Sequence, residues 1–171
     1  MTKIIKIGIL ILLIPISIMA QKKEQLPESK VDYDSFLTIS EEVQKYRTSR
    51  MVTIDEFLEY LKDEHTLLLD TRSEKAYTQK HIKAAVHLNF SDFTEEKLKK
   101  IIPSKNTRIL IYCNNNIDGD TLHFASKMMP LALNIPTFIN LYGYGYKNIY
   151  ELGALVPSTD NRLIFSGTEV K

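Results

Sequence analysis

The middle of the chain carries two short apolar runs in which polar and apolar residues do not alternate. Three leucines at 67–69 are followed by Asp70, and the run Arg-Ile-Leu-Ile-Tyr at 108–112 is followed by Cys113. Short runs of this kind are typical of strands that are covered on both faces. Weaker runs predict two further strands, at residues 85–88 and 137–141.

Helical patterns lie between these runs. Thr53, with Glu56 three residues later, has the sequence of a capping box, and apolar residues follow at the spacing of one helix face. Start and stop signals predict three more helices, at residues 38–46, 94–102 and 121–133. Strands that alternate with helices predict an α/β fold, with a parallel sheet, helices on both faces and right-handed crossovers.

The first twenty residues have a different pattern. Lys3 and Lys6 precede an uncharged, Ile/Leu-rich run that ends at Ala20, and polar residues follow from Gln21, which is the layout of a secretory signal. The run is shorter than the roughly 20 residues that a membrane span needs. We therefore expect a signal peptide at residues 1–20, export to a periplasm, and no membrane span after cleavage. The alternative is an uncleaved N-terminal anchor.

The remaining chain is expected to form one domain with two extensions. Residues 21–49 are polar and are expected to form a leader with a short N-terminal helix. Residues 50–156 hold the predicted strands and helices, and residues 157–171 follow as a tail. The apolar residues Leu163, Ile164 and Phe165 are expected to attach this tail to the domain.

Composition and charge exclude several classes of protein. The 171 residues include 22 basic and 21 acidic side chains without a clustered basic excess, so nucleic acid is not an expected partner. A single cysteine excludes a disulfide framework within the chain and a site with several thiolate ligands. The four histidines have no metal-ligand spacing with an acidic cluster, so neither a metal nor a cofactor is expected.

Cys113 lies where thiol chemistry is favoured. The carboxyl ends of parallel strands form the reactive edge of an α/β sheet, and both Asp70 and Cys113 follow predicted strands. Asparagine and glycine tolerate left-handed backbone angles, so residues 114–119 could curl their N–H groups around the sulfur as an anion-binding nest. The helix predicted next would add its positive N-terminal end. We interpret Cys113 as a working thiol, with a buried structural cysteine as the alternative.

Three segments, in this order, resemble the rhodanese-like domain family. Residues 68–72 (Leu-Leu-Asp-Thr-Arg), Tyr77 and residues 81–88 (His-Ile-Lys-Ala-Ala-Val-His-Leu) resemble the family's D-x-R … F/Y-x-x-G-H-I-x-G-A-x-N segment. Residues 109–113 resemble the strand that leads into its active-site cysteine. Residues 145–149 resemble its closing glycine-aromatic segment.

The resemblance spans about residues 50–156 and implies a five-stranded parallel sheet flanked by helices. The family's usual activity is sulfur transfer, in which a donor such as thiosulfate loads a sulfane sulfur onto the cysteine as a persulfide and a thiophilic acceptor removes it. The resemblance makes Cys113 the nucleophile, and gives Asp70, Arg72 and His81 structural roles around the site. It makes a cradle of the backbone of Asn114, Asn115, Asn116, Ile117, Asp118 and Gly119.

The charge of this loop departs from the family pattern. Active sulfurtransferases of the family commonly carry Arg or Lys five residues after the cysteine, where this chain has Asp118, and related cysteine phosphatases carry Arg six residues after it, where Gly119 stands. A unit charge at about 6 Å and an effective dielectric of about 20 is worth roughly 3 kcal/mol before screening. Asp118 and Asp120 therefore disfavour a thiolate and a dianion, so we expect weak or no thiosulfate activity and no phosphatase activity.

Other residues near the expected edge have structural interpretations. Asp70 and Arg72 are expected to form an ion pair that holds the strand edge. His123 could reach the sulfur region, but a surface or core-bonded histidine is the favoured interpretation. Tyr142, Tyr144 and Tyr146 are interpreted as packing residues, with a ligand-facing aromatic wall as the alternative.

Three functions remain open on the sequence. The first is an exported sulfurtransferase or persulfide carrier that uses Cys113, with a small sulfur donor or a thiol acceptor as partner. The second is a catalytically silent module that binds a protein partner or a small ligand at the same edge. The third is a redox-responsive thiol that forms mixed disulfides in an oxidising compartment.

Overall fold

A five-stranded parallel sheet in the order β1-β7-β5-β2-β4 forms the centre of the fold, as the sequence predicts. The computed structural model describes residues 26–170. The strands of this sheet are β1 (Met51–Val52), β2 (Thr66–Asp70), β4 (Val86–His87), β5 (Arg108–Tyr112) and β7 (Ile149–Leu152). Two small sheets pair β3 (His81–Ile82) with β9 (Phe165–Ser166) and β6 (Ile117–Asp118) with β8 (Val156–Pro157).

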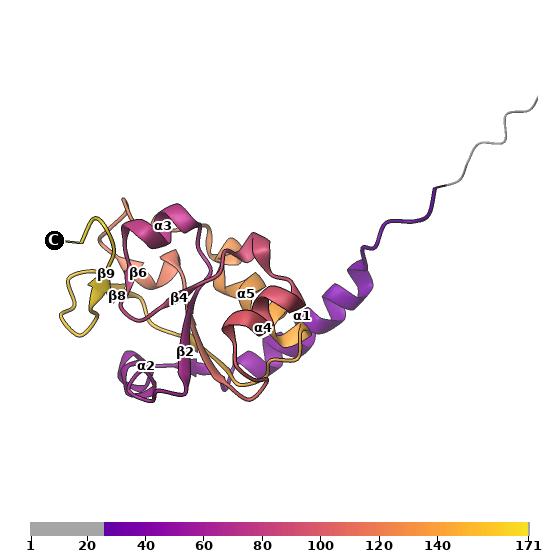
Figure 1. Cartoon of the computed structure of the whole chain (residues 1–171), viewed down its shortest axis with the longest axis horizontal. Helices are drawn as coiled ribbons and strands as arrows, with labels where there is room; N and C mark the ends of the chain where they lie inside the picture. The colour runs from indigo at the N-terminus through magenta and orange to yellow at the C-terminus, as the bar shows by residue number, and fades with distance from the viewer. Residues whose placement is uncertain (1–25, 171) are drawn as a thin grey trace, which may run out of the picture. The chain divides into compact units, whose positions relative to one another are not determined.

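The described residues also contain five α-helices and three 3-10 turns. The helices are α1 (Tyr33–Arg47), α2 (Ile54–Tyr60), α3 (Glu74–Gln79), α4 (Glu95–Ile101) and α5 (Asn134–Gly143). The turns are η1 (Phe90–Asp92), η2 (Asn114–Asn116) and η3 (Met129–Leu131). In Figure 1, α2 and α3 lie on one side of β2, and α1, α4 and α5 lie on the other.

The chain divides into two units. Residues 32–171 form one unit, which holds every helix and strand named above, and residues 1–31 form the other. Residues 26–31, the described part of that first unit, contain neither a helix nor a strand. The expected signal peptide at residues 1–20 lies outside the described residues. No helix within residues 26–170 has the length and apolarity that crossing a membrane requires.

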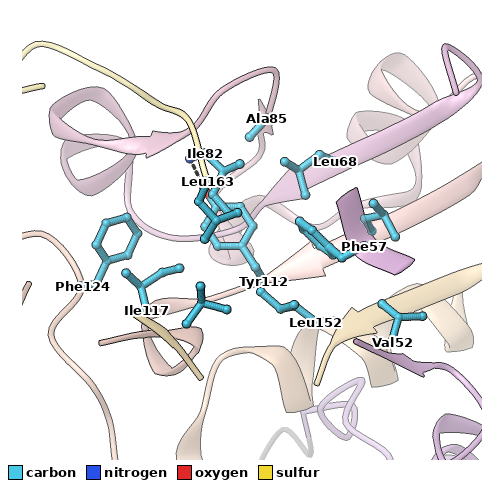
Figure 2. Close-up of a cluster of buried hydrophobic side chains, with 12 residues drawn as sticks. Val52, Phe57, Leu68, Ile82, Ala85, Tyr112, Ile117, Phe124, Leu152 and Leu163 are labelled. Atoms are coloured by element: carbon cyan, nitrogen blue, oxygen red, sulfur yellow. Dashed lines mark hydrogen bonds between the residues drawn. The ribbon is translucent and has the colours of Figure 1, made fainter. Parts of the chain in front are cut away.

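Two hydrophobic layers cover the sheet because the side chains of a strand point alternately to its two faces. In β5, Leu110 and Tyr112 pack with Phe57 of α2 on one face, where Figure 2 shows the cluster. Ile109 and Ile111 pack on the opposite face, with side chains of α1, α4 and α5. Because both faces of β5 are buried in these layers, polar and apolar residues do not alternate in the run at 108–112.

Several local predictions are confirmed. Thr53 caps α2, and both hydrogen bonds of the capping box with Glu56 are present. The apolar runs at 67–69 and 108–112 form the two longest strands, and Thr94 caps α4. The helix expected to begin at Thr38 begins earlier, at Tyr33, because the Asp32 side chain accepts the N–H of Ser35 and supplies the N-cap.

The strand predicted at residues 137–141 is wrong, because this segment belongs to α5. Residues 135, 138, 139 and 142 are apolar at helical spacing, and both sides of the helix are largely covered, so the run looks like a buried strand. Gly145, at φ +85°, ends the helix, and Tyr146 N–H donates to the carbonyl of Leu141. The fifth strand is β7 instead.

The helix predicted at residues 121–133 is also wrong. This segment consists of turns, loop and η3. Asparagine side chains bond its backbone groups: Asn114 Nδ2 donates to the Ala125 carbonyl at 2.9 Å, and the Asn115 amide bonds both the N–H and the carbonyl of Lys127. Pro130 adds a residue without a backbone donor.

The C-terminal tail is attached to the domain, as expected from Leu163 and Phe165. The Leu163 side chain lies in the cluster of Figure 2 and is 5% exposed, and Phe165 pairs with Ile82 in the sheet formed by β3 and β9. Ile164, between them, is 60% exposed.

A polar cluster holds the end of the tail. His123 Nδ1 lies 2.9 Å from Asp120 Oδ1, and its Nε2 lies 3.0 Å from Glu169 Oε2. Lys80 Nζ contacts the other oxygen of Asp120 at 2.9 Å. The Glu169 and Asp120 carboxylates raise the pKa of His123 above its ordinary value. The His123 ring therefore connects the tail to the loop that follows β6.

Replacing Leu163 by Ala should lower the free energy of unfolding by about 2–5 kcal/mol, because the change leaves a cavity in the core. The matched substitution Ile164→Ala, on the neighbouring exposed residue, should change it by less than about 0.5 kcal/mol. Urea denaturation measures both. Equal losses for the two variants would show that the tail is not packed as described.

Replacing His123 by Gln should destabilise the protein more at acidic than at alkaline pH. Since the pKa of His123 is raised in the folded state, its contribution is complete below the unfolded value of about 6.5 and is lost as the pH rises through the folded value. Urea denaturation at about pH 6 and about pH 9 tests this sign. The control His65→Gln changes an exposed histidine and should cost about the same free energy of unfolding at both pH values. If His123→Gln also costs the same at both, the contacts of His123 with Asp120 and Glu169 would be contradicted.

Candidate active site

Cys113 follows β5 directly and lies at the carboxyl edge of the sheet. It is 1% exposed, yet it lines an open cavity of about 480 Å³. Arg47 of α1, Asn134 of α5 and Glu151 of β7 bring polar and charged side chains to the same cavity. Its other polar lining residues are Asn115, Asn116, Ser126 and Lys127. The thiol is therefore neither on the surface nor enclosed in the hydrophobic core.

Backbone N–H groups from two separate segments lie close enough to the Cys113 sulfur to lower the pKa of its thiol. One belongs to Asn115 in η2, and two belong to Leu133 and Asn134 at the start of α5. The sequence predicts that the positive N-terminal end of a helix at 121–133 lies near the sulfur. In the structure the ten-residue helix α5 supplies that positive end instead. The sulfur has an amide cradle that is discontinuous in sequence.

The expected nest of left-handed asparagines is wrong. Asn114–Asn116 form a 3-10 turn, and within residues 26–170 Ala84 is the only residue other than glycine with a positive φ. An extended strand end followed by a 3-10 turn keeps these three residues at negative φ. Gly119, at φ +77°, is the one residue of the expected loop that takes the left-handed conformation.

Asn116 connects the elements around the cysteine. Its Oδ1 accepts the Cys113 N–H at 2.9 Å and the Asn134 Nδ2 at 2.9 Å, and its Nδ2 donates to the Leu152 carbonyl at 2.7 Å. These bonds join the ends of β5 and β7 to the start of α5. Asn116 is buried, so losing one of these partners would leave a buried polar group unsatisfied.

The later residues of the expected loop lie outside the cavity. Ile117 is buried in the core on the α2 side of the sheet, and Asp118 is exposed next to it in β6. Asp118, Gly119 and Asp120 do not line the cavity, and Asp120 bonds Lys80 and His123. The acidic loop is thus not the source of negative charge beside the sulfur.

Glu151 is the carboxylate that shares the cavity with Cys113. In β7, Ile149 and Glu151 point to the face covered by α1 and α5, because alternate side chains of a strand share a face. Arg47, the last residue of α1, binds Glu151 with both Nε (2.5 Å) and Nη2 (2.8 Å). Asn134 Nδ2 donates to the same carboxylate at 3.1 Å. Glu151 is only 5% exposed.

The surroundings disfavour the thiolate form of Cys113. Burial raises its pKa above the ordinary value, and the negative charge of Glu151 acts in the same direction. The N–H groups of Asn115, Asn134 and Leu133 oppose this shift without cancelling it. The hydrogen bonds from Arg47 to Glu151 raise the pKa of the guanidinium.

The sequence analysis missed Arg47, Asn134 and Glu151. Glu151 interrupts an apolar run at 149–152, and a charged residue in such a run at the end of a parallel strand is the signal that could have revealed it. The signal is hidden because the last strand is predicted at 137–141 rather than at β7. Arg47 and Asn134 carry no comparable local signal.

Asp70 and Arg72 form the expected buried ion pair and lie outside the cavity. Arg72 Nη2 contacts Asp70 Oδ2 at 2.7 Å, and the Tyr112 hydroxyl donates to the same oxygen at 2.5 Å. Arg72 also donates to the carbonyls of Lys80 and His123, so the pair fixes the chain around the end of β2. Its role is structural.

The remaining histidine and tyrosine candidates are packing residues. His81 stacks on Tyr77 with ring centroids 3.9 Å apart and bonds the Tyr77 carbonyl through Nδ1. Tyr142, Tyr144 and Tyr146 lie at the carboxyl end of α5, about 15 Å along the helix from the residues that face Cys113. Within residues 26–170, no three His, Cys, Asp or Glu side chains are grouped so as to hold a metal ion.

Comparisons with solved structures identify similar folds. The BH2092 protein of Bacillus halodurans shares 16% identity with a TM-score of 0.53, over 78% of this chain and 88% of that one. A rhodanese-like domain from the Alr3790 protein of Anabaena sp. gives 16% identity and a TM-score of 0.48, over 70% and 80% of the two chains. A rhodanese with anions from E. coli shares 17% identity with a TM-score of 0.40, over 60% of this chain and 99% of that one.

The sequence comparisons give one family and no individual relative. No curated protein matches the chain. The sequence model of the rhodanese-like domain matches residues 53–153, which include β2, β5, Cys113 and Glu151 and begin after α1. This match covers more than half of the chain. The protein belongs to the rhodanese-like domain family.

Proposed function

We propose that this protein transfers sulfane sulfur through a persulfide on Cys113. The observation that carries the proposal is the position of the sulfur: it lines an open cavity at the carboxyl edge of the sheet and faces three backbone N–H groups. Such donors stabilise negative charge on a thiolate or on a terminal persulfide sulfur. Membership of the rhodanese-like family supports sulfur transfer as the class of reaction.

The reaction has two balanced steps. The Cys113 thiolate attacks the outer sulfur of a donor, the donor's sulfur–sulfur bond breaks, and its inner sulfur leaves with the electron pair. An acceptor thiolate then attacks the outer sulfur of the Cys113 persulfide and releases the Cys113 thiolate. No net oxidation occurs, so neither a metal nor a redox cofactor is needed.

The alternative functions have less support. A silent binding module does not account for a thiol that lines the cavity together with a buried ion pair. A redox-responsive thiol needs an accessible thiolate for disulfide exchange, whereas Cys113 is nearly fully buried and burial raises its pKa. A cavity of about 480 Å³ has room for a small sulfur donor.

Incubation with inorganic polysulfide should add the mass of one sulfur atom to the intact protein, and the added atom should map to Cys113. Cys113→Ser is the matched control and should gain nothing. A low-molecular-weight thiol added afterwards should remove the atom and become persulfidated itself. A folded wild-type protein that gains no sulfur from polysulfide, from thiosulfate or from a short alkyl persulfide, as measured by mass spectrometry, would refute the proposal.

We also infer that the protein is exported, on the strength of the residue pattern at 1–20. In a bacterium that expresses the full sequence, the mature chain recovered from the periplasm should begin at Gln21. N-terminal sequencing decides this, and a chain that stays in the cytoplasm with residues 1–20 intact would contradict it.

A further inference from the structure

The cavity beside Cys113 has an unusual distribution of charge. Three of the residues that line it carry a formal charge: Arg47, Lys127 and Glu151. Arg47 donates two hydrogen bonds to Glu151, so its charge is already compensated by that carboxylate. Lys127 is exposed to solvent, where screening weakens its effect. No uncompensated cation therefore lies in the buried part of the cavity, where Cys113 is.

Glu151 makes this buried part unfavourable for anions. Its side chain is held by Arg47 and Asn134 and is almost completely shielded from solvent. Solvent therefore screens the electric field of this carboxylate at the Cys113 sulfur much less than it screens the field of a surface carboxylate. An anionic donor that brings its outer sulfur to Cys113 must approach this carboxylate.

Part of the mouth of the cavity is apolar. Met51, Met129 and Leu155 line it and are all exposed to solvent. Ala132 and Leu152 add apolar surface deeper in. Methionine side chains are flexible and polarizable and adapt to apolar groups of different shape, including those that carry sulfur. These apolar side chains offer contact area to a carbon skeleton, and the exposed donors at the mouth, Ser126 and Lys127, lie in solvent rather than beside the buried sulfur.

We propose that the cavity selects sulfur carriers with an apolar body and little charge, such as alkyl persulfides, and excludes dianions such as thiosulfate. Glu151 determines this specificity, and Arg47 is the positioning residue that holds the carboxylate in place. The proposal rests on the proposed function, because it takes Cys113 as the atom that receives the sulfur.

The balance of charge in the transfer step supports this selection. When the Cys113 thiolate attacks the outer sulfur of R–S–S–H, the donor's sulfur–sulfur bond breaks, R–S⁻ leaves with the electron pair, and the proton stays on the transferred sulfur. One negative charge is present throughout. The same attack on thiosulfate gathers three negative charges beside Glu151 and releases sulfite.

Alkylation of Cys113 measures this field without any sulfur transfer. Iodoacetamide is neutral and iodoacetate is anionic, and both react with the same thiolate, so the ratio of their rates does not depend on the thiol pKa. The ratio of iodoacetate to iodoacetamide rates should be about tenfold lower in the folded wild-type protein than in the same chain in urea. Equal ratios in the two states would overturn the proposal without the need for any variant.

Three variants assign the effect to Glu151. Glu151→Gln should raise the iodoacetate ratio toward the value in urea, because it removes the carboxylate and frees the Arg47 guanidinium. Arg47→Gln should lower the ratio further. Glu59→Gln, at an exposed carboxylate of α2, should leave it unchanged. A folded Glu151→Gln variant with the wild-type ratio would overturn the role of Glu151.

Sulfur donors provide the second readout. A short alkyl persulfide should load wild-type Cys113 at least about tenfold faster than thiosulfate at equal concentration, and Glu151→Gln should narrow this difference. Equal loading by the two donors would overturn the selectivity while leaving sulfur transfer intact. If no donor loads Cys113 but the alkylation ratios behave as stated, the proposed function fails and the anion-excluding field stands.

Discussion

The ion pair between Arg47 and Glu151 is the interaction on which the site depends. A carboxylate buried without a partner costs several kcal/mol, and removing one member of a buried pair typically destabilises a protein by about 3–5 kcal/mol. Glu151 is buried in β7 and is compensated by two hydrogen bonds from Arg47 and one from Asn134. The pair therefore joins α1, α5 and β7 around the cysteine that ends β5.

The helix α1 thereby contributes to the candidate site although it precedes the segment matched by the family. Its last residue brings a guanidinium to the cavity, in a chain whose loop has Asp118 where sulfurtransferases of the family commonly carry a cation. A cation in the loop could bind an anionic substrate directly. The Arg47 guanidinium is less able to do so, because it already donates two hydrogen bonds to Glu151. The site thus combines a thiol, an amide cradle and a partly apolar mouth, and its buried part holds no cation that is free of a carboxylate partner.

The parts of the fold that depend on local signals could be predicted from the sequence. The capping box at Thr53 and the two central strands depend on residues that are close in sequence, and Cys113 at the end of β5 follows from the same pattern. The Asp70–Arg72 pair spans two residues and was predictable for the same reason. Such signals specify which elements exist and where the reactive edge lies.

The parts that depend on contacts between distant segments could not be predicted in this way. A helix covered on most sides has an apolar run that a strand also has, so α5 was taken for the last strand and β7 was missed. The cradle depends on α5 returning to the end of β5, twenty residues later in the chain than Cys113. Arg47 and Glu151 are brought together only by the packing of α1 against β7 and α5, which no local pattern records.

The most direct test of the account is the titration of Cys113 itself. Because the chain has one cysteine, a ¹³C label at cysteine Cβ reports this thiol alone by NMR. The account predicts a pKa above the ordinary thiol value of about 8.5 in the wild type and a clearly lower value in Glu151→Gln. A wild-type pKa at or below that ordinary value, or one that Glu151→Gln leaves unchanged, would contradict it.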